Sequence, residues 1–174
     1  RPRHGNPHPR ICETEAGFLN SIGLENRGID AYLDEVLPQM GTADCAVVTN
    51  IGGESPEDFA RVAERLDDRA EVDALEVNLS CPNVQAEFGR PFALDAAAAA
   101  AVTRAVKGAT SIPITVKLSP NTPDLTAIAQ SVVAAGADAL TAVNTVGPGM
   151  LIDLESGQPI LANRVGGLSG PAIR

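Results

Sequence analysis

The chain has 174 residues, of which 44% are hydrophobic, and its net charge is −9; this composition is typical of a globular protein with one core. The acidic balance and an aromatic content of only 3% argue against nucleic acid as a partner. No apolar run reaches the roughly 18 residues that span a bilayer, so we expect no membrane partner either.

The first forty residues predict a hairpin, a loop and a helix. Residues 10–13 and 17–19 can pair around a short turn, and residues 20–26 form a loop rich in Asn, Ser and Gly. Residues 28–37 carry apolar side chains at helical spacing, and Pro38 is expected to end that helix.

From residue 45 onward, strands and helices alternate. Short apolar runs predict strands at 45–50, 72–77, 112–118 and 138–143. Helices are predicted between them: one from an N-cap at Ser55 to Leu66, one from residue 94 or 95 until Gly108, and one over 124–135 before Gly136. This alternation is typical of α/β proteins built from βαβ units, with a parallel sheet covered by helices.

The end of the chain predicts a loop, a hairpin and a further unit. Residues 144–149 form the loop, and residues 150–162 form the hairpin, with its turn at Ser156 and Gly157. Residues 165–170 begin another strand–loop–helix unit.

The three cysteines, Cys12, Cys45 and Cys81, cannot all pair with one another, and their spacing fits no zinc motif. Together with a polar N-terminus that shows no signal peptide, this predicts a reduced, cytoplasmic compartment. Cys45 is predicted to be a core thiol and Cys12 an exposed or hairpin one. Cys81 follows a strand directly, where a thiol is exposed enough to react, although it could equally be inert.

Polar side chains stand at the carboxyl ends of the predicted strands, which is where α/β proteins place their active sites. A single Asn there is more often a turn residue, but several in register favour a ligand site. The set can hydrogen-bond a planar polar ligand and includes no His cluster, so no metal site is expected. Its members are Asn50, Asn78, Cys81, Asn83, Lys117, Asn144 and Thr145.

Lys117 lies in a run that reads as a buried strand. A buried lysine is costly unless its charge is paired, so a functional role is favoured over a structural one.

The segment 76–84, Glu-Val-Asn-Leu-Ser-Cys-Pro-Asn-Val, closely resembles the active-site signature of class 1 dihydroorotate dehydrogenases. The resemblance extends in the family's order to residues 20–26, 116–121, 144–149 and 166–173, and so covers essentially the whole chain. Asn-Ser-Ile-Gly-Leu at 20–24 and Gly-Gly-Leu-Ser-Gly-Pro at 166–171 look most like the B subtype, the catalytic subunit that passes electrons to NAD through a partner.

The resemblance implies an FMN-dependent (β/α)8 TIM barrel that oxidises (S)-dihydroorotate to orotate in pyrimidine (UMP) biosynthesis. By that analogy Cys81 is the base that removes the C5 proton while hydride leaves C6 for FMN. Residues 85–91 would form a lid over the substrate. The positions that match substrate contacts are Asn20, Ser21, Ile22, Gly23, Leu24, Asn78, Asn83, Asn144 and Thr145. Those that match FMN contacts are Asn50, Asn78, Lys117, Val143 and Gly170, with Ser169 as an alternative to Gly170.

The B subtype implies a partner subunit, an iron–sulfur flavoprotein that carries FAD and a 2Fe-2S cluster, in a heterotetramer around a homodimer of catalytic subunits. A whole barrel has eight βα units in about 250 residues. We therefore expect residues 1–174 to be a single barrel domain truncated at both ends, with four clear strands and the start of a fifth. Alone, such a piece is expected to bind FMN weakly and to be inactive.

Three other interpretations stay open. A flavin domain like that of dihydropyrimidine dehydrogenase, which acts on uracil or thymine, tends to carry His where this chain has Asn83. The fumarate-dependent A subtype shares the same signature. A non-catalytic fragment of the barrel is the third, although the retention of Cys81 and Lys117 argues against it.

Overall fold

The computed structural model describes residues 1–80 and 92–174. The chain divides into two compact units: residues 1–34 together with 145–174, and residues 35–144. Among the described residues, none of the helices combines the length and the apolar character that a membrane crossing requires.

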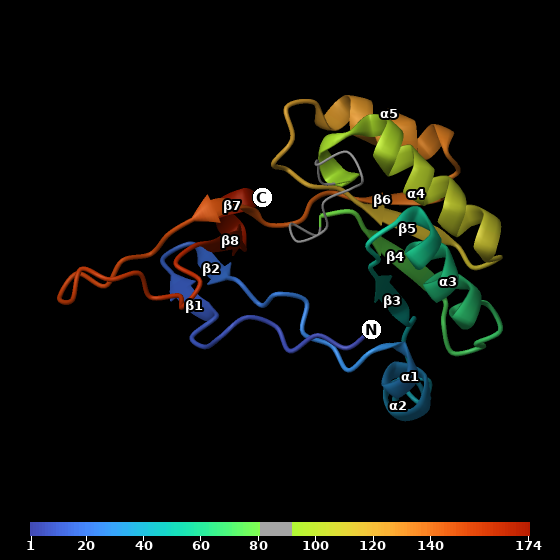
Figure 1. Cartoon of the computed structure of the whole chain (residues 1–174), viewed down its shortest axis with the longest axis horizontal. Helices are drawn as coiled ribbons and strands as arrows, with labels where there is room; N and C mark the ends of the chain where they lie inside the picture. Colours follow the sequence, from blue (N-terminus) through green and yellow to red (C-terminus); the bar gives the residue numbers. More distant parts are fainter. Residues whose placement is uncertain (81–91) are drawn as a thin grey trace. The chain divides into compact units, whose positions relative to one another are not determined.

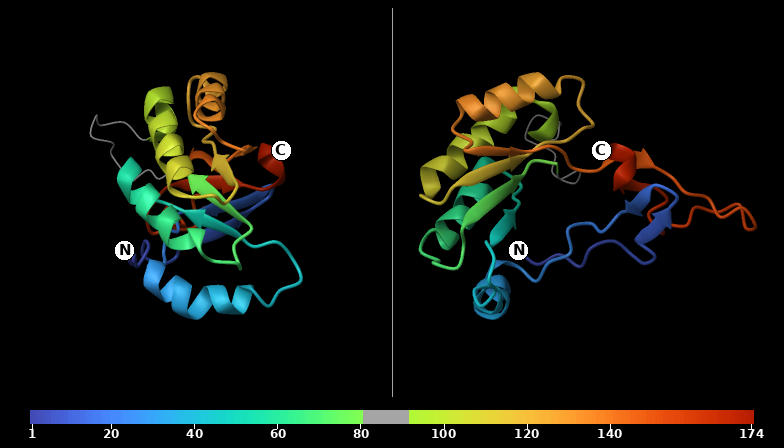
Figure 2. Two further views of the ribbon diagram at one scale, coloured as in Figure 1. Left: turned by 90° about the vertical axis from the view of Figure 1, so that its right-hand side faces the viewer. Right: turned by 180° about the vertical axis from the view of Figure 1, so that it is seen from behind.

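The unit of residues 35–144 is built on a parallel sheet of four strands, in the order β3-β4-β5-β6. The strands are β3 (Val48–Ile51), β4 (Ala74–Asn78), β5 (Ile114–Lys117) and β6 (Ala139–Thr141). The helices are α3 (Pro56–Asp67), the 3₁₀ turn η2 (Phe92–Leu94), α4 (Ala96–Ala109) and α5 (Leu125–Ala134). Figure 1 shows α3, α4 and α5 on the same side of the sheet, and Figure 2 shows this arrangement from two further directions.

Side-chain caps begin α3, α4 and α5, and the cap at Ser55 confirms the prediction. The Ser55 hydroxyl accepts a hydrogen bond from the Asp58 N–H, and Asp95 and Asp124 accept equivalent bonds from residues three positions on. One prediction is wrong, because Gly108 does not end α4 but lies within it. The helix buries Val102 and Val106, and this packing outweighs the cost of about 1 kcal/mol for a helical glycine.

The core of this unit lies between the helices and one face of the sheet. Leu75 and Val77 of β4 are fully buried in this core. Phe59 of α3 is also fully buried and packs edge-on against Phe92, with ring centroids 6.0 Å apart. Successive side chains of a strand alternate between faces, so Glu76 and Asn78 point away from this core.

The opposite face of the sheet is not covered by the described residues of the unit. Val48 of β3 is 50% exposed there. Parallel sheets are normally covered on both faces. A strand order without reversal, with the helices on one side, is typical of (β/α)8 barrels rather than of doubly wound sheets. The unit is therefore a mixed α/β structure consistent with part of a barrel.

Strand β3 begins later than predicted, at Val48 instead of residue 45. Pairing with β4 begins only at Val48, opposite Ala74. Cys45 precedes the strand and is exposed, so the prediction of a core thiol is wrong.

The unit of residues 1–34 and 145–174 contains an antiparallel sheet in the order β1-β2-β8-β7. Its strands are β1 (Ile11–Thr14), β2 (Gly17–Asn20), β7 (Val146–Gly149) and β8 (Gly166–Ser169), followed by the 3₁₀ turn η3 (Pro171–Ile173). The β1–β2 hairpin confirms the prediction and places the half-buried Cys12 in it.

Two predictions for the end of the chain are wrong. Residues 146–149 form a strand instead of a loop, and β8 is antiparallel instead of the start of a fifth βα unit. The parallel strands therefore number four among the described residues. The glycines of β8 explain the difference, because a Cβ on Gly166 would lie 2.4 Å from the Asn20 carbonyl oxygen and one on Gly167 would lie 2.1 Å from Thr145 Oγ1.

The hairpin predicted for residues 150–162 is confirmed in outline. Ile152 and Pro159 form an isolated antiparallel bridge, and Gly157 in the turn has a φ of +68°. Leu154 near its tip is 95% exposed.

The helix predicted to end at Pro38 continues past that residue. It consists of α1 (Ile29–Ala31), the π-helical η1 (Tyr32–Val36) and α2 (Leu37–Met40). Pro38 stands in the first turn of α2, after the π-helical turn, where a missing N–H costs little. The change of helix type is the reason that proline does not end the helix.

Replacing Asp67 with Asn is expected to lower the urea midpoint of the protein at neutral pH. The Asp67 carboxylate accepts hydrogen bonds from the Thr110 hydroxyl and the Ser111 N–H, both at 2.6 Å, and these bonds hold the pKa of Asp67 below its ordinary value of 3.8. A carboxyl with a lowered pKa stabilises the fold above its unfolded pKa and loses this effect as pH falls through the folded pKa. The difference in urea midpoint between the wild type and Asp67→Asn should therefore be largest at pH 7 and shrink below about pH 3.8. A difference that does not change with pH would contradict this role of Asp67.

Candidate active site

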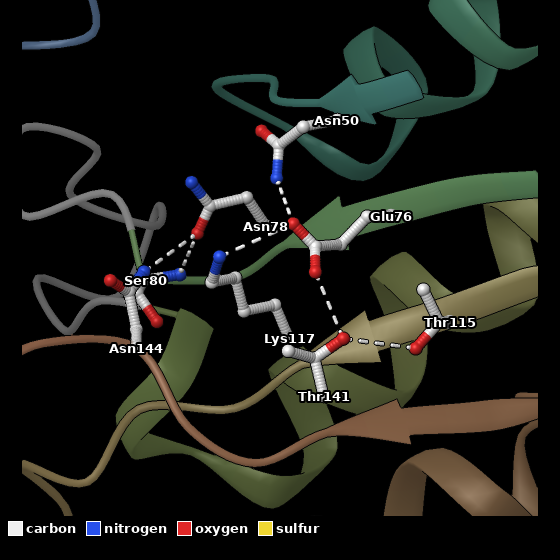
Figure 3. A network of polar contacts seen from close by, with 8 residues as sticks. All are labelled: Asn50, Glu76, Asn78, Ser80, Thr115, Lys117, Thr141 and Asn144. Atoms are coloured by element: carbon white, nitrogen blue, oxygen red, sulfur yellow. Dashed lines mark hydrogen bonds and ion pairs between the residues drawn. The ribbon is translucent and has the colours of Figure 1, made fainter. Parts of the chain in front are cut away.

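Polar side chains from neighbouring strands meet on the uncovered face of the parallel sheet (Figure 3). The sheet register places Asn50 of β3 opposite Glu76 of β4, and Asn78 of β4 opposite Lys117 of β5. Glu76 and Asn78 are two residues apart, so both point to this face. The strands thus bring three predicted site residues, Asn50, Asn78 and Lys117, to one surface.

Glu76 lies at the centre of this group. Its Oε2 accepts hydrogen bonds from Asn50 Nδ2 at 2.6 Å and from Lys117 Nζ at 3.3 Å, and its Oε1 accepts one from Thr141 Oγ1 at 2.9 Å. Thr141 Oγ1 is in turn 3.2 Å from Thr115 Oγ1. One carboxylate therefore connects all four strands of the sheet.

The electrostatics of Glu76 follow from these contacts. Its side chain is 17% exposed and that of Lys117 is 27% exposed. Burial raises the pKa of Glu76, but the hydrogen bonds from Asn50 and Thr141 and the charge of Lys117 outweigh burial, so the pKa lies below its ordinary value. Glu76 is therefore a carboxylate at neutral pH, and Lys117 is paired rather than isolated.

Asn78 extends the group to the carboxyl ends of the strands. Its Oδ1 accepts hydrogen bonds from the Ser80 N–H at 3.1 Å and from Asn144 Nδ2 at 3.3 Å. Asn144 follows β6 and is held there by a bond from its N–H to the Leu118 carbonyl at 2.8 Å. Among the described residues, the buried hydroxyl of Ser80 has no hydrogen-bond partner.

Further predicted site residues, Asn20 and the loop 21–24, belong to the other unit, residues 1–34 with 145–174. Asn20 ends β2 and donates to the Gly167 carbonyl at 3.4 Å. The loop 21–24 has positive φ angles at Gly23 and Leu24, and its Ser21 hydroxyl is buried without a partner among the described residues.

Asn6 holds this loop in place. Its Nδ2 donates to the Ser21 carbonyl at 2.8 Å, and its N–H donates to the Ile22 carbonyl at 2.9 Å. A Cβ on Gly23 would lie only 2.8 Å from the Asn6 side chain, so this position requires glycine.

The other predicted positions are placed as follows. Thr145 lies against Gly167 and Gly170 follows β8, whereas Val143 follows β6 and is half-buried. Cys81, Asn83 and the predicted lid at 85–91 lie outside the described residues.

Sequence reasoning missed Glu76 as a site residue. The signal was a charged side chain at the middle of an apolar strand, two positions before Asn78 and thus on the same face. Among the described residues, no group of three or more His, Cys, Asp or Glu side chains could hold a metal ion. The group as found offers one ammonium, one carboxylate and several amides, which suits a planar polar ligand.

Comparison with known proteins identifies the family. The family model described as "Dihydroorotate dehydrogenase" matches residues 1–174. The catalytic subunit of dihydroorotate dehydrogenase B (NAD(+)) from Geotalea daltonii is 52% identical over 174 residues, covering 100% of this chain and 56% of that protein. The subunit of the same name from Bacillus pumilus is 49% identical over 173 residues, covering 99% of this chain and 55% of that protein.

The chain thus spans about half the length of the curated relatives it matches. Among solved structures, the carboxyl transferase domain of Rhizobium etli pyruvate carboxylase has a TM-score of 0.41 and 20% identity, covering 57% of this chain and 16% of that one, which is too distant to indicate a shared fold. The match to the family model over the whole length, together with relatives at about half identity, shows that this chain belongs to the dihydroorotate dehydrogenase family.

Proposed function

We propose that this chain is part of the catalytic subunit of a dihydroorotate dehydrogenase, which oxidises dihydroorotate to orotate in pyrimidine biosynthesis. The observation that carries the proposal is the group of Asn50, Asn78, Lys117 and Asn144 around Glu76 on one face of a parallel sheet. These residue types can hydrogen-bond a planar polar ligand, and they occur here in a chain of the dihydroorotate dehydrogenase family.

We propose further that the segment belongs to a closed (β/α)8 barrel. The uncovered sheet face, with Val48 half exposed and polar side chains along it, would then be the barrel interior. The length of the relatives supports this, because this chain corresponds to only 55–56% of them. The remaining strands would cover the face that this unit leaves open.

The residues present fit FMN as the cofactor. The ammonium of Lys117 and the amides of Asn50 and Asn78 form a donor set for a planar ring with several oxygen and nitrogen atoms, and the buried Ser80 hydroxyl beside them lacks a partner among the described residues. Val143 and Gly170 match further FMN positions of the family's motifs. Bound FMN would supply the acceptor for the hydride that leaves C6 of the substrate.

Cys81 is proposed as the base that takes the C5 proton. A thiol with an ordinary pKa of about 8.5 lies close enough to neutrality for this role. Asn78 and Asn144 would hydrogen-bond the ring amides and carboxylate of dihydroorotate, since amide side chains both donate and accept. The matching motifs add Thr145, Asn83 and the loop of residues 20–24 to the substrate side.

The relatives named B (NAD(+)) favour the subtype that passes its electrons to NAD. Their names describe a catalytic subunit, which supports a partner subunit for this protein as well. We propose that this partner is an iron–sulfur flavoprotein carrying FAD and a 2Fe-2S cluster, in a cytoplasmic heterotetramer around a homodimer of catalytic subunits.

The full-length subunit is expected to be yellow and to lose its flavin absorbance when dihydroorotate is added without oxygen. Reduction by dihydrouracil instead would favour the dihydropyrimidine dehydrogenase interpretation, and reduction by neither would favour a non-catalytic barrel. NAD-dependent turnover should require the co-purified iron–sulfur subunit. Efficient turnover with fumarate by the catalytic subunit alone would identify the A subtype.

A further inference from the structure

Glu76 matches neither a substrate position nor an FMN position of the family's motifs, yet it lies at the centre of the candidate site. Its carboxylate is the shared acceptor for Asn50 and Lys117, two side chains that match FMN positions, and it is anchored from the far side by Thr141. Lys117 and Asn50 come from the strands on either side of β4. One acidic group thus fixes two donors on different strands.

We propose that Glu76 is a positioning residue that holds Lys117 and Asn50 toward the flavin and sets, through its own negative charge, how much of the Lys117 charge the flavin experiences. The inference rests on the proposed function, because it requires FMN on this face of the sheet. A lysine on a flexible four-carbon stem has many rotamers, and a fixed acceptor removes most of them before the cofactor binds.

The charge balance gives the second part of the argument. Lys117 is the ammonium of this group, and the Glu76 carboxylate lies 3.3 Å from it in a partly buried setting, where charges interact more strongly than in water. Reduction adds negative charge to FMN, which an ammonium nearby stabilises. A carboxylate beside that ammonium offsets part of this stabilisation and so lowers the midpoint potential of the bound flavin.

The variant Glu76→Gln separates charge from geometry. A glutamine can place its oxygen where Oε2 accepts from Asn50 and Lys117, and its amide can donate to Thr141 Oγ1, because that hydroxyl can itself donate to Thr115. The hydrogen-bond pattern is kept and one negative charge is lost. We expect the redox equilibrium of bound FMN to shift about tenfold toward the reduced form, an upward change of about 30 mV for two electrons.

The variant Glu76→Asp tests positioning, because it keeps the charge and shortens the side chain by one methylene. FMN affinity of the full-length subunit should fall about tenfold while the potential of the flavin that does bind stays near that of the wild type. Asp138→Asn is the matched control. Asp138 also pairs with a lysine, Lys107 of α4, at 2.6 Å. It precedes β6 and accepts from the N–H of Ile114, where β5 begins, so it lies at the opposite end of the strands from the candidate site.

Spectroelectrochemical titration and FMN binding to the apo-subunit measure these quantities without substrate. An unchanged potential in Glu76→Gln, or a shift equal to that of the Asp138→Asn control, would overturn the inference. If Glu76→Gln does not fold, unchanged FMN affinity in Glu76→Asp would overturn it instead. A wild-type subunit that holds no FMN would refute the proposed function, whereas a normal wild type with an unaffected Glu76→Gln variant would refute this inference alone.

Discussion

Replacing Cys81 with Ala is expected to slow reduction of the flavin by dihydroorotate by about 10²- to 10⁴-fold, because general-base catalysis contributes factors of this size. Alanine removes the proton acceptor but leaves the amides of Asn78 and Asn144 and the ammonium of Lys117 in place. FMN should therefore stay bound at the wild-type stoichiometry. Anaerobic stopped-flow absorbance of the full-length subunit measures the rate directly.

The chain provides a matched control for this experiment. Cys45 is exposed and precedes β3, and its replacement with Ala removes a thiol outside the proposed site. We expect that variant to reduce its flavin at the wild-type rate. Wild-type rates in both variants would show that Cys81 is not the base, whereas equal slowing in both would point to a general effect of thiol removal.

The pH dependence of the same half-reaction provides a second test of the base. A thiol acts as a base only as the thiolate, so the wild-type rate should rise with pH as the thiolate fraction grows and then level off. Cys81→Ser should shift this rise to higher pH, since a hydroxyl ionises less readily than a thiol. The same pH profile in wild type and serine variant would assign the proton transfer to another group.

Replacing Lys117 with Met is expected to weaken FMN binding by about 10- to 100-fold. Hydrogen bonds to charged groups contribute about 1.5–3 kcal/mol, and each 1.4 kcal/mol corresponds to a factor of ten. Met keeps most of the volume of the side chain but removes the cation that faces Glu76 at 3.3 Å. The lost charge should also raise the pKa of Glu76, because Lys117 is one of the groups that lower it.

The other lysine of the chain serves as the control. Lys107 pairs with Asp138 in a largely exposed contact, and such pairs contribute at most about 1 kcal/mol to stability. In a fluorescence titration of the apo-subunit with FMN, which measures the affinity of both variants, Lys107→Met should bind FMN like the wild type. Equal FMN affinity in Lys117→Met and the wild type would remove Lys117 from the cofactor site.

Local signals in the sequence predicted most of the parallel sheet and its helices. Ser55, Asp95 and Asp124 cap the three long helices as their residue types indicate, because capping depends only on neighbouring backbone groups. The four strands are apolar runs of adequate length, although pairing shortened each of them at one or both ends. Asn50, Asn78 and Lys117 were predicted at the carboxyl ends of their strands, but it is the sheet register that brings them to one face.

Other features depended on contacts between distant residues. Pro38 reads as the end of a helix, but a π-helical turn before it places it where no N–H is needed. Residues 146–149 and 166–169 read as a loop and as a new βα unit, and only their pairing with each other and with β2 makes them an antiparallel sheet. Both segments are rich in glycine, and the residue pattern specifies the pairing of such strands only weakly.

The sequence by itself thus determined the α/β class, the helix boundaries set by caps, and the polar residues at the strand ends, because these depend on local backbone preferences and strand periodicity. The tertiary structure alone decided the partner of Lys117. Glu76 is a single charged residue in an apolar strand, and its role emerges only when the sheet register brings donors from β3, β5 and β6 to one carboxylate. A partly buried ion pair is stable only with such additional hydrogen bonds, and these come from strands far apart in the chain.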